Sequence, residues 1–256
     1  MIENQNKMSG GIEVNTEVTL KQPTGNDEVT RGIQKRAVQL LVQFLFLAAI
    51  LFLSSGRLDW WFAWVYLGIF VLGVGVNSYV LLRVNPELIA ERARQFTPET
   101  KKWDRILATL WGLMSVIVAL LVAGLDKRFG WSPEMPMTVH LIAMLFYMFG
   151  SAFAAWALVS NPFFAGTVRI QTERGHSVAS SGPYRFVRHP GYAGWMISNV
   201  AVVVMLGSMW ALIPAVIAVL ALVARTALED RTLREELPGY EEYAQRVRYR
   251  LVPGIW

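Results

Sequence analysis

Apolar runs with almost no charge divide the chain into segments long enough to cross a bilayer. They fall at about 37–53, 60–82, 106–125 and 138–159, and each is close to the roughly 20 residues that span hydrocarbon. A further stretch, from about 191 to 224, is too long for one ordinary span. Gly207-Ser208 near its middle, followed by Pro214, gives it a place to turn. The pattern predicts an all-α, polytopic integral membrane protein of about six transmembrane helices, the last two forming a helical hairpin.

The polar segments divide this pattern into three parts. Residues 1–30 mix polar and charged residues without an apolar period, which predicts a disordered N-terminal tail. Residues 31–160 hold the first four predicted transmembrane helices. Residues 161–256 hold the hairpin and a polar segment after it. Overall, 54% of the residues are hydrophobic and only 17% are charged, which agrees with a membrane protein.

The basic residues predict the orientation. Of 24 Lys and Arg, 21 lie before the first span, between spans two and three, in residues 160–190, or from Arg225 onward. With six spans these four segments share one side, which the positive-inside rule makes cytoplasmic. Both termini and the polar ends of the hairpin are therefore expected in the cytoplasm. Because the basic residues flank spans, they indicate contact with membrane lipids and not with nucleic acid.

Several chemistries are disfavoured by the residues present. The chain has no cysteine, which excludes disulfides, thiolate metal sites and cysteine nucleophiles. Its three histidines, His140, His176 and His189, lack the ligand spacing of a metal site, so none is expected. His140 is the one ionisable residue well inside a span, and we expect it to be a hydrogen-bonded packing residue. The shortage of intramembrane charge argues against a transporter or channel.

A short helix is predicted between spans two and three. Pro86 stands at a helix-start position, and Leu88 and Ile89 are apolar residues among charges. Such a helix lies at the membrane interface. It serves either as a solvated anchor or as a lid over a lipid substrate.

The first arm of the hairpin opens with "FVRHPGYAG", residues 186–194. Pro190 suits the first turn of a helix, because it has no N–H to leave unsatisfied. The free N–H groups of that turn attract anions, and Gly191 and Gly194 allow a ligand or another helix to approach closely. Alternatively, Arg188 and His189 are interfacial anchors and the glycines serve helix packing.

The second arm leaves the membrane directly into a charged segment. Arg225 and Glu229 lie four residues apart on one helical face, with Asp230 beside them. They form either an ion pair on a solvated helix or one wall of a pocket that the Arg188-His189 end completes. A pocket there would hold a ligand with both charge and apolar bulk.

Taken together, "SGPYRFVRHPGYAGW", the apolar hairpin, "RTALEDRTL" and "GYEEY" resemble the C-terminal core of the isoprenylcysteine carboxyl methyltransferase family. Wider relatives of that family include membrane phospholipid N-methyltransferases. The resemblance covers about residues 165–256. It implies that S-adenosylmethionine binds at the cytoplasmic end of the hairpin.

The resemblance also assigns roles to residues. Arg225 matches the family's arginine for the substrate carboxylate. Two departures are present: the stretch from Gln171 to His176 is shorter than in eukaryotic members, and Asp230 stands where the family often has Glu. The positions that match cofactor contacts are Gln171, His176, Ser177, Val178, Ala179, Tyr184, His189, Pro190, Gly191, Tyr192 and Glu229.

The expected function is therefore S-adenosylmethionine-dependent methyl transfer to a lipophilic acceptor at the membrane, with an isoprenylcysteine-type carboxylate favoured. An ionised carboxylate needs no general base, so catalysis would come from alignment and exclusion of water. Two alternatives stay open: an NADPH-dependent reductase of the sterol or 5α-reductase type, and a non-enzymatic membrane scaffold or transporter. The acceptor's identity, the oligomeric state and the role of residues 1–30 are not predicted.

Overall fold

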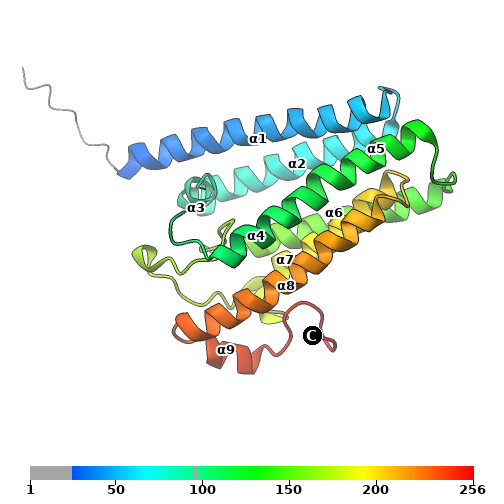
Figure 1. Cartoon of the computed structure of the whole chain (residues 1–256). Coiled ribbons are helices and arrows are strands. Elements are labelled where there is room, and N and C mark those ends of the chain that lie inside the picture. The colour runs from blue at the N-terminus through cyan, green and yellow to red at the C-terminus, as the bar shows by residue number, and fades with distance from the viewer. Residues whose placement is uncertain (1–24, 95–96) are drawn as a thin grey trace, which may run out of the picture.

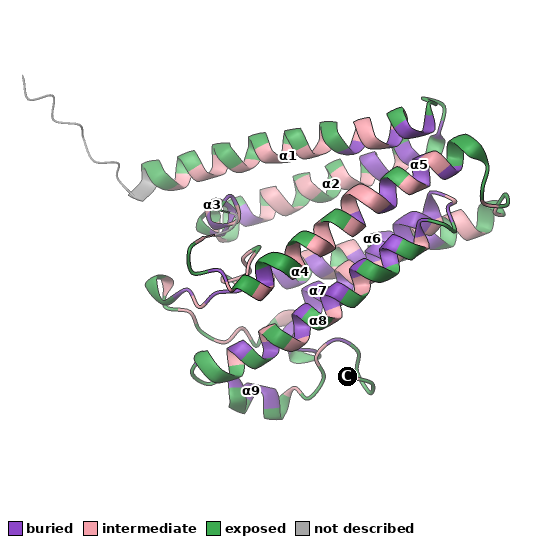
Figure 2. Ribbon diagram, viewed as in Figure 1, coloured by how far each residue is buried: buried purple, intermediate pink, exposed green. Residues whose placement is uncertain are grey.

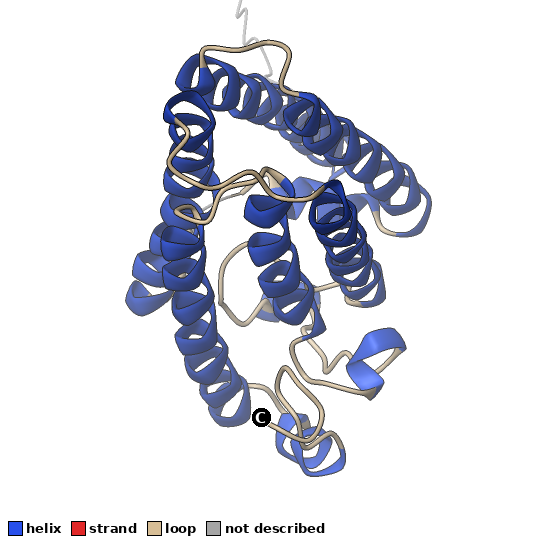
Figure 3. Ribbon diagram, turned by 90° about the vertical axis from the view of Figure 1, so that its right-hand side faces the viewer, coloured by secondary structure: helices blue, strands red, loops and turns tan. Residues whose placement is uncertain are grey.

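The computed structural model describes residues 25–94 and 97–256, and this part of the chain consists of helices and loops with no strand (Figure 3). One long helix is built of three consecutive pieces: α4 (Lys102–Gly112), a π-helical stretch η1 (Leu113–Val118) and α5 (Ala119–Phe129). The helices are α1 (Gly25–Ser55), α2 (Trp61–Val84), α3 (Pro86–Arg92), α4 (Lys102–Gly112), α5 (Ala119–Phe129), α6 (Met137–Ser160), α7 (Pro190–Met205), α8 (Leu212–Glu236) and α9 (Tyr240–Arg246), with 3-10 turns η2 (Thr172–Arg174) and η3 (Gly182–Arg185).

Five helical segments of the described residues are long and apolar enough to cross a membrane: α1, α2, the α4–α5 unit, α6 and α8. The first arm of the hairpin, α7, is apolar but has 16 residues. At 1.5 Å per residue it is about 24 Å long, short of the roughly 30 Å hydrocarbon core. The prediction of an all-α polytopic membrane protein is confirmed, with a short helix in the sixth place.

The hairpin forms where the sequence places it. α7 begins at Pro190, directly after His189, and ends before a turn in which Gly207 has φ +83°. That backbone conformation favours glycine, which has no Cβ to clash. Ser208 accepts a hydrogen bond from Ala211 N (3.1 Å), which closes the turn before α8 begins. The predicted turn is confirmed.

The arms of the hairpin pack against different neighbours. α7 lies along α6, and α8 lies along the α4–α5 unit (Figure 1). Residues of α7 are largely buried, whereas the outer face of α1 is exposed along most of its length (Figure 2). Exposed Val38, Leu41 and Leu45 on that face are apolar. They suit contact with lipid tails.

The loops between helices gather at two ends of the bundle. The start of α1, the α2–α4 connection, residues 161–189 and α9 lie at one end, and the α1–α2, α5–α6 and α7–α8 connections lie at the other (Figure 1). Within the described residues, the first end carries the basic residues of the four segments. The second carries Arg57, Lys127 and Arg128.

Two predictions about the N-terminal half need correction or refinement. α1 begins at Gly25, inside the segment predicted as a disordered tail, while residues 1–24 lie outside the described residues. The short helix at Pro86 is present as α3. Its Leu88 and Ile89 are buried in a cluster with Leu81 and Leu158 and so face protein.

His140 has the packing role that was predicted. Its ring stacks on Phe62 with centroids 4.3 Å apart, and its Nδ1 lies 2.7 Å from the carbonyl oxygen of Met205. Among the described residues, no group of three His, Cys, Asp or Glu is arranged to hold a metal ion.

Candidate active site

A pocket opens where the first turn of α7, the end of α8, α9 and the loop over residues 161–184 meet. The empty space between these walls, counted out to the open mouth, is about 750 Å³. Aromatic, charged and small polar side chains all contribute. The lining residues are Asn161, Phe163, Phe164, Ala165, Thr167, Val168, Arg169, His176, Ser177, Val178, Ala179, Tyr184, Arg188, His189, Gly191, Tyr192, Glu229, Leu233, Leu237, Tyr240 and Tyr243.

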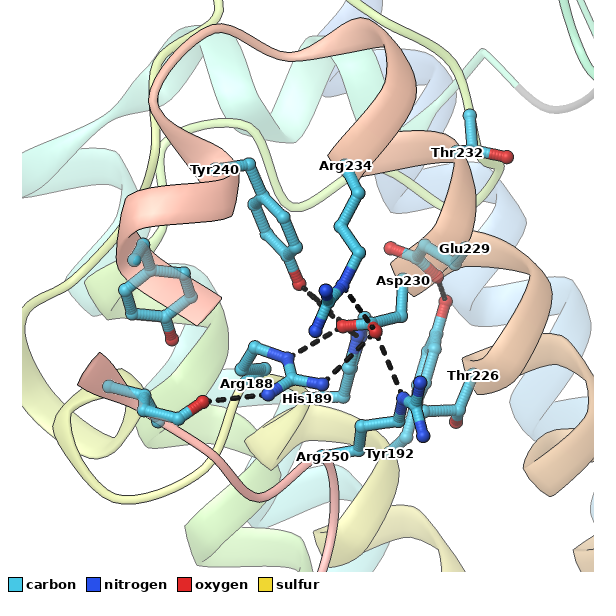
Figure 4. A network of polar contacts seen from close by, with 12 residues as sticks. Arg188, His189, Tyr192, Thr226, Glu229, Asp230, Thr232, Arg234, Tyr240 and Arg250 are labelled. Carbon is cyan, nitrogen blue, oxygen red and sulfur yellow. Dashed lines mark hydrogen bonds and ion pairs between the residues drawn. The ribbon is translucent and has the colours of Figure 1, made fainter. Parts of the chain in front are cut away.

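Asp230 joins three of these walls. Its side chain is fully buried and accepts two hydrogen bonds from the Arg188 guanidinium, 2.7 Å from Nε to Oδ1 and 3.0 Å from Nη2 to Oδ2 (Figure 4). Tyr240 of α9 donates to Oδ1 (3.1 Å), and Arg250 donates to Oδ2 (2.9 Å). Bidentate arginine–carboxylate pairs combine charge with fixed geometry. Asp230 therefore fixes the Arg188-His189 end against α8 and α9.

The other side of Arg188 holds the segment after α9. Its Nη1 donates to the carbonyl oxygens of Val247 and Arg248, both at 2.7 Å. Arg188 is 4% exposed, so it is not the interfacial anchor of the alternative prediction. Its function in the structure is to connect α8 with residues 247–248.

The Tyr240 hydroxyl contacts Asp230 in its protonated form. Burial raises the pKa of Tyr240 above its usual range, and the negative charge of Asp230 raises it further. The hydroxyl therefore stays protonated at neutral pH and donates to the carboxylate. The sequence motif "GYEEY" supplies both this residue and Tyr243, whose hydroxyl donates to the carbonyl oxygen of Tyr184 (2.7 Å).

Glu229 faces the pocket from α8, one residue before Asp230. Tyr192 on α7 donates a short hydrogen bond from its hydroxyl to Glu229 Oε2 (Figure 4). The His189 and Tyr192 rings stack with centroids 5.8 Å apart. A carboxylate, a phenol and an imidazole thus lie together at the hairpin end, as the resemblance implied.

Arg225 has a different partner from the one its spacing predicted. Its Nε donates to Asp104 Oδ1 of α4 (2.6 Å), and its Nη2 donates to the carbonyl oxygen of Gly166 (2.9 Å). The side chain of Arg225 is 3% exposed and that of Asp104 is fully buried. The alternative of a solvated pair between Arg225 and Glu229 is therefore wrong. The arginine meets the pocket through Tyr192, over whose ring its Cζ lies 5.3 Å from the centroid.

The two glycines at the start of α7 contact protein. A Cβ on Gly194 would lie 2.5 Å from the backbone oxygen of Gly150 and 2.7 Å from the backbone nitrogen of Ala154, both on α6. A Cβ on Gly191 would lie 2.6 Å from the ring of Phe164. Helix packing is thus confirmed for Gly194, whereas Gly191 contacts a loop side chain and also lines the pocket.

The loop wall is ordered by its own polar contacts. Gln171 is 1% exposed, donates to the carbonyl oxygen of Phe163 (2.8 Å) and accepts from Arg174 (2.5 Å). Its backbone N–H lies 3.3 Å from His176 Nδ1. Burial, followed by the charges of Arg169 and Arg174, lowers the pKa of His176 to about 4. The imidazole is therefore neutral at physiological pH.

The structure brings most of the predicted cofactor residues together. His176, Ser177, Val178, Ala179, Tyr184, His189, Gly191, Tyr192 and Glu229 line one pocket. Gln171 and Arg225 lie behind its walls, and Pro190 starts α7 beside it. Sequence reasoning missed Asp104 and Arg169. Each comes from a segment with no periodic pattern that points to the hairpin.

This region of the chain is similar to known proteins. Residues 141–235 match the model of the isoprenylcysteine carboxyl methyltransferase (ICMT) family. Two curated rice proteins, from Oryza sativa subsp. indica and subsp. japonica, are each called "Probable protein-S-isoprenylcysteine O-methyltransferase". Each is 30% identical over 112 residues, which make up 43% of this chain and 59% of the relative. The matched part of each relative is thus less than two thirds of its length.

Proposed function

We propose that this chain, whose residues 141–235 match the model of the isoprenylcysteine carboxyl methyltransferase family, transfers a methyl group from S-adenosylmethionine to the carboxylate of a lipophilic acceptor. One observation carries the proposal. Nine residues expected from the family resemblance to contact the cofactor line a single pocket at the end of the hairpin, although they come from a loop, α7 and α8.

The residues of the pocket fit the chemistry of this cofactor. S-adenosylmethionine combines a flat adenine, two ribose hydroxyls, a zwitterionic amino acid and a sulfonium cation. The aromatic rings of Phe163, Tyr184 and Tyr240 offer flat apolar faces, and the Glu229 carboxylate suits hydroxyl or ammonium donors. Arg169 and Arg188 also line the pocket. The donor set therefore includes a partner for each polar part.

The mechanism assigned to this chain is one of positioning. When bound, the cofactor supplies a methyl group that an ionised carboxylate attacks in line. The acceptor is already an anion, so the residues need to move no proton. Glu229 holds hydroxyl or ammonium groups of the cofactor, and the walls of the pocket exclude water around the opposite charges.

Arg225 is proposed to orient the acceptor carboxylate. Asp104 and the carbonyl oxygen of Gly166 take its Nε and Nη2, and its Nη1 donates to no group of the described chain. One nitrogen is thus available, so the contact we propose is a single charge-assisted hydrogen bond. Asp104 also accepts from Val168 N (2.8 Å), which fixes the arginine relative to the lining loop.

Two further observations support an acceptor with a lipid tail and a site on the cytoplasmic side of the membrane. Hairpin ends that leave the bilayer beside the pocket suit an acceptor with a lipid tail, and the names of the rice relatives point to isoprenylcysteine. Within the described residues, the end of the bundle that bears the pocket carries the basic residues of the four segments (Figure 1). The positive-inside rule supports a cytoplasmic site.

Calorimetric titration of the purified, detergent-solubilised protein with S-adenosylhomocysteine tests the proposal. Saturable binding is expected, and Glu229→Ala and His189→Ala are expected to weaken it. Glu235→Ala is the matched control, because Glu235 is an exposed carboxylate on α8 that pairs with Arg231. Radiolabelled methyl transfer to a prenylated N-acetylcysteine then tests the acceptor class.

The same titration with NADPH separates the alternatives. Binding of NADPH without S-adenosylhomocysteine would overturn the methyltransferase proposal in favour of a membrane reductase. Binding of neither would favour a scaffold or transporter.

A further inference from the structure

Arg169 is a buried cation in the lining of the pocket. It is 8% exposed and is held on two sides: its Nη2 donates to Glu91 Oε1 of α3, and its Nη1 donates to Glu173 Oε1, both at 2.7 Å. Its Nε, by contrast, is buried and has no hydrogen-bond partner within the described residues. Buried donors of this kind are rarely left unpaired, and a charged one is the most costly to leave so.

Besides Arg169 and its partner Glu173, the loop carries a second arginine. Arg174 lies on the same loop, with its Nη1 on Gln171 (2.5 Å) and its Nη2 on the carbonyl oxygen of Pro162 (3.2 Å). Burial and the charges of Arg169 and Arg174 together lower the pKa of the pocket residue His176. Arg169 is thus a cationic residue of the loop wall, while Glu229 is the carboxylate of the α8 wall.

Arg169 is also held in place before any ligand arrives. Glu91 is 6% exposed, and its other carboxylate oxygen lies 3.8 Å from Arg94. A side chain that is already fixed loses little conformational freedom when it binds. The Arg169 Nε–H is thus a donor, unpaired within the described part of the chain, on a fixed residue that lines the pocket.

We infer that Arg169 receives a carboxylate group of the ligand in this pocket through its Nε–H. The inference rests on the proposed function, which offers two sources of that group: the amino-acid part of the cofactor and the acceptor. Both are carboxylates, and an arginine N–H forms a charge-assisted hydrogen bond with either.

Arg169→Lys is the decisive variant, because it keeps a positive charge against Glu91 and removes the Nε–H. If the cofactor is the source, this variant binds S-adenosylhomocysteine about tenfold more weakly. It binds the decarboxylated analogue, in which a hydrogen replaces the carboxylate, as the wild type does. If the acceptor is the source, S-adenosylhomocysteine binding is unchanged and the KM for a prenylated N-acetylcysteine rises about tenfold.

Glu173→Gln is the control, because it removes the half-exposed partner of the same guanidinium and leaves Nε as it is. A purely structural role of Arg169 would lower the melting temperature of Arg169→Lys without changing either binding constant, and that result would overturn the inference. Failure of the wild type to bind S-adenosylhomocysteine would instead overturn the proposed function.

The wild type provides a test that does not depend on the folding of variants. If the cofactor is the source, the wild type should bind S-adenosylhomocysteine more tightly than the decarboxylated analogue. If the acceptor is the source, it should bind the prenylated N-acetylcysteine more tightly than the carboxamide of the same compound, measured as a competitive inhibitor. Equal affinity in both comparisons would show that no carboxylate is recognised, and the inference would fail.

Discussion

Replacing Asp230 with Asn should destabilise the protein far more than loss of an ordinary surface ion pair. The Asp230 side chain is 0% exposed and that of its bidentate partner Arg188 is 2% exposed. Asn keeps the shape but removes the charge, which leaves the guanidinium buried without a counter-ion. Breaking such a pair costs about 3–5 kcal/mol. Arg234 and Arg250, with side chains 36% and 30% exposed, can turn to water and add little.

This cost can be measured by thermal unfolding in detergent. With about 2–4 °C of melting temperature per kcal/mol at this chain length, the expected shift is about 6–20 °C downward. Glu241→Gln is the control, because it removes an exposed partner of Arg234 and should cost about 1 kcal/mol or less. Since the pair is buried, 1 M salt should not reduce the difference between the variants. A shift for Asp230→Asn no larger than that of the control would refute the reasoning.

Three further changes have defined outcomes. Gly194→Ala places a Cβ 2.5 and 2.7 Å from two backbone atoms of α6, so unfolding experiments should show a loss of about 1–3 kcal/mol, whereas Gly68→Ala, with open space around it, should be neutral or stabilising. In the ligand-free protein, the melting temperature should fall as pH drops from 6.5 towards 4, because the unfolded chain protonates His176 at its ordinary pKa of 6.5 and the folded chain only at about 4. His176→Asn should lose that part of the pH dependence, and an unchanged profile would contradict the assignment. Tyr192→Phe removes the hydroxyl bound to Glu229, so titration should show S-adenosylhomocysteine binding about fivefold weaker; unchanged binding would place Glu229 outside the cofactor contacts.

The sequence predicted those features of the fold that local chemistry determines. Pro190 begins α7 and Gly207 turns the hairpin, because a missing N–H and a missing Cβ act on their own segment of backbone. The same local reasoning could not fix the start of α1. Gly25 and the residues after it carry no apolar period, and they continue as a helix from a segment that packs against α3 and α5.

The candidate site was predicted as far as residue types near the hairpin allow. Asp230 and Arg225 were singled out, but their partners were not. Arg225 pairs with Asp104, 121 residues earlier, and Arg169 pairs with Glu91, 78 residues earlier. Such pairs depend on how α4 and α3 pack, which no spacing in the sequence encodes. Gln171 shows the converse case, since its identity matched a family position while its side chain faces the loop interior.

The Arg188 hydrogen bonds also set an order of events during synthesis. Asp230 emerges 42 residues after Arg188, and the carbonyl groups of Val247 and Arg248 emerge 59 and 60 residues after it. At about 5–20 residues per second, the last of these follow by about 3–12 s. For most of that interval α7 is already synthesised, while Arg188, which precedes it, lacks these carbonyl groups. The Arg188 wall of the pocket therefore reaches its final shape only after residues 247–248 have been synthesised.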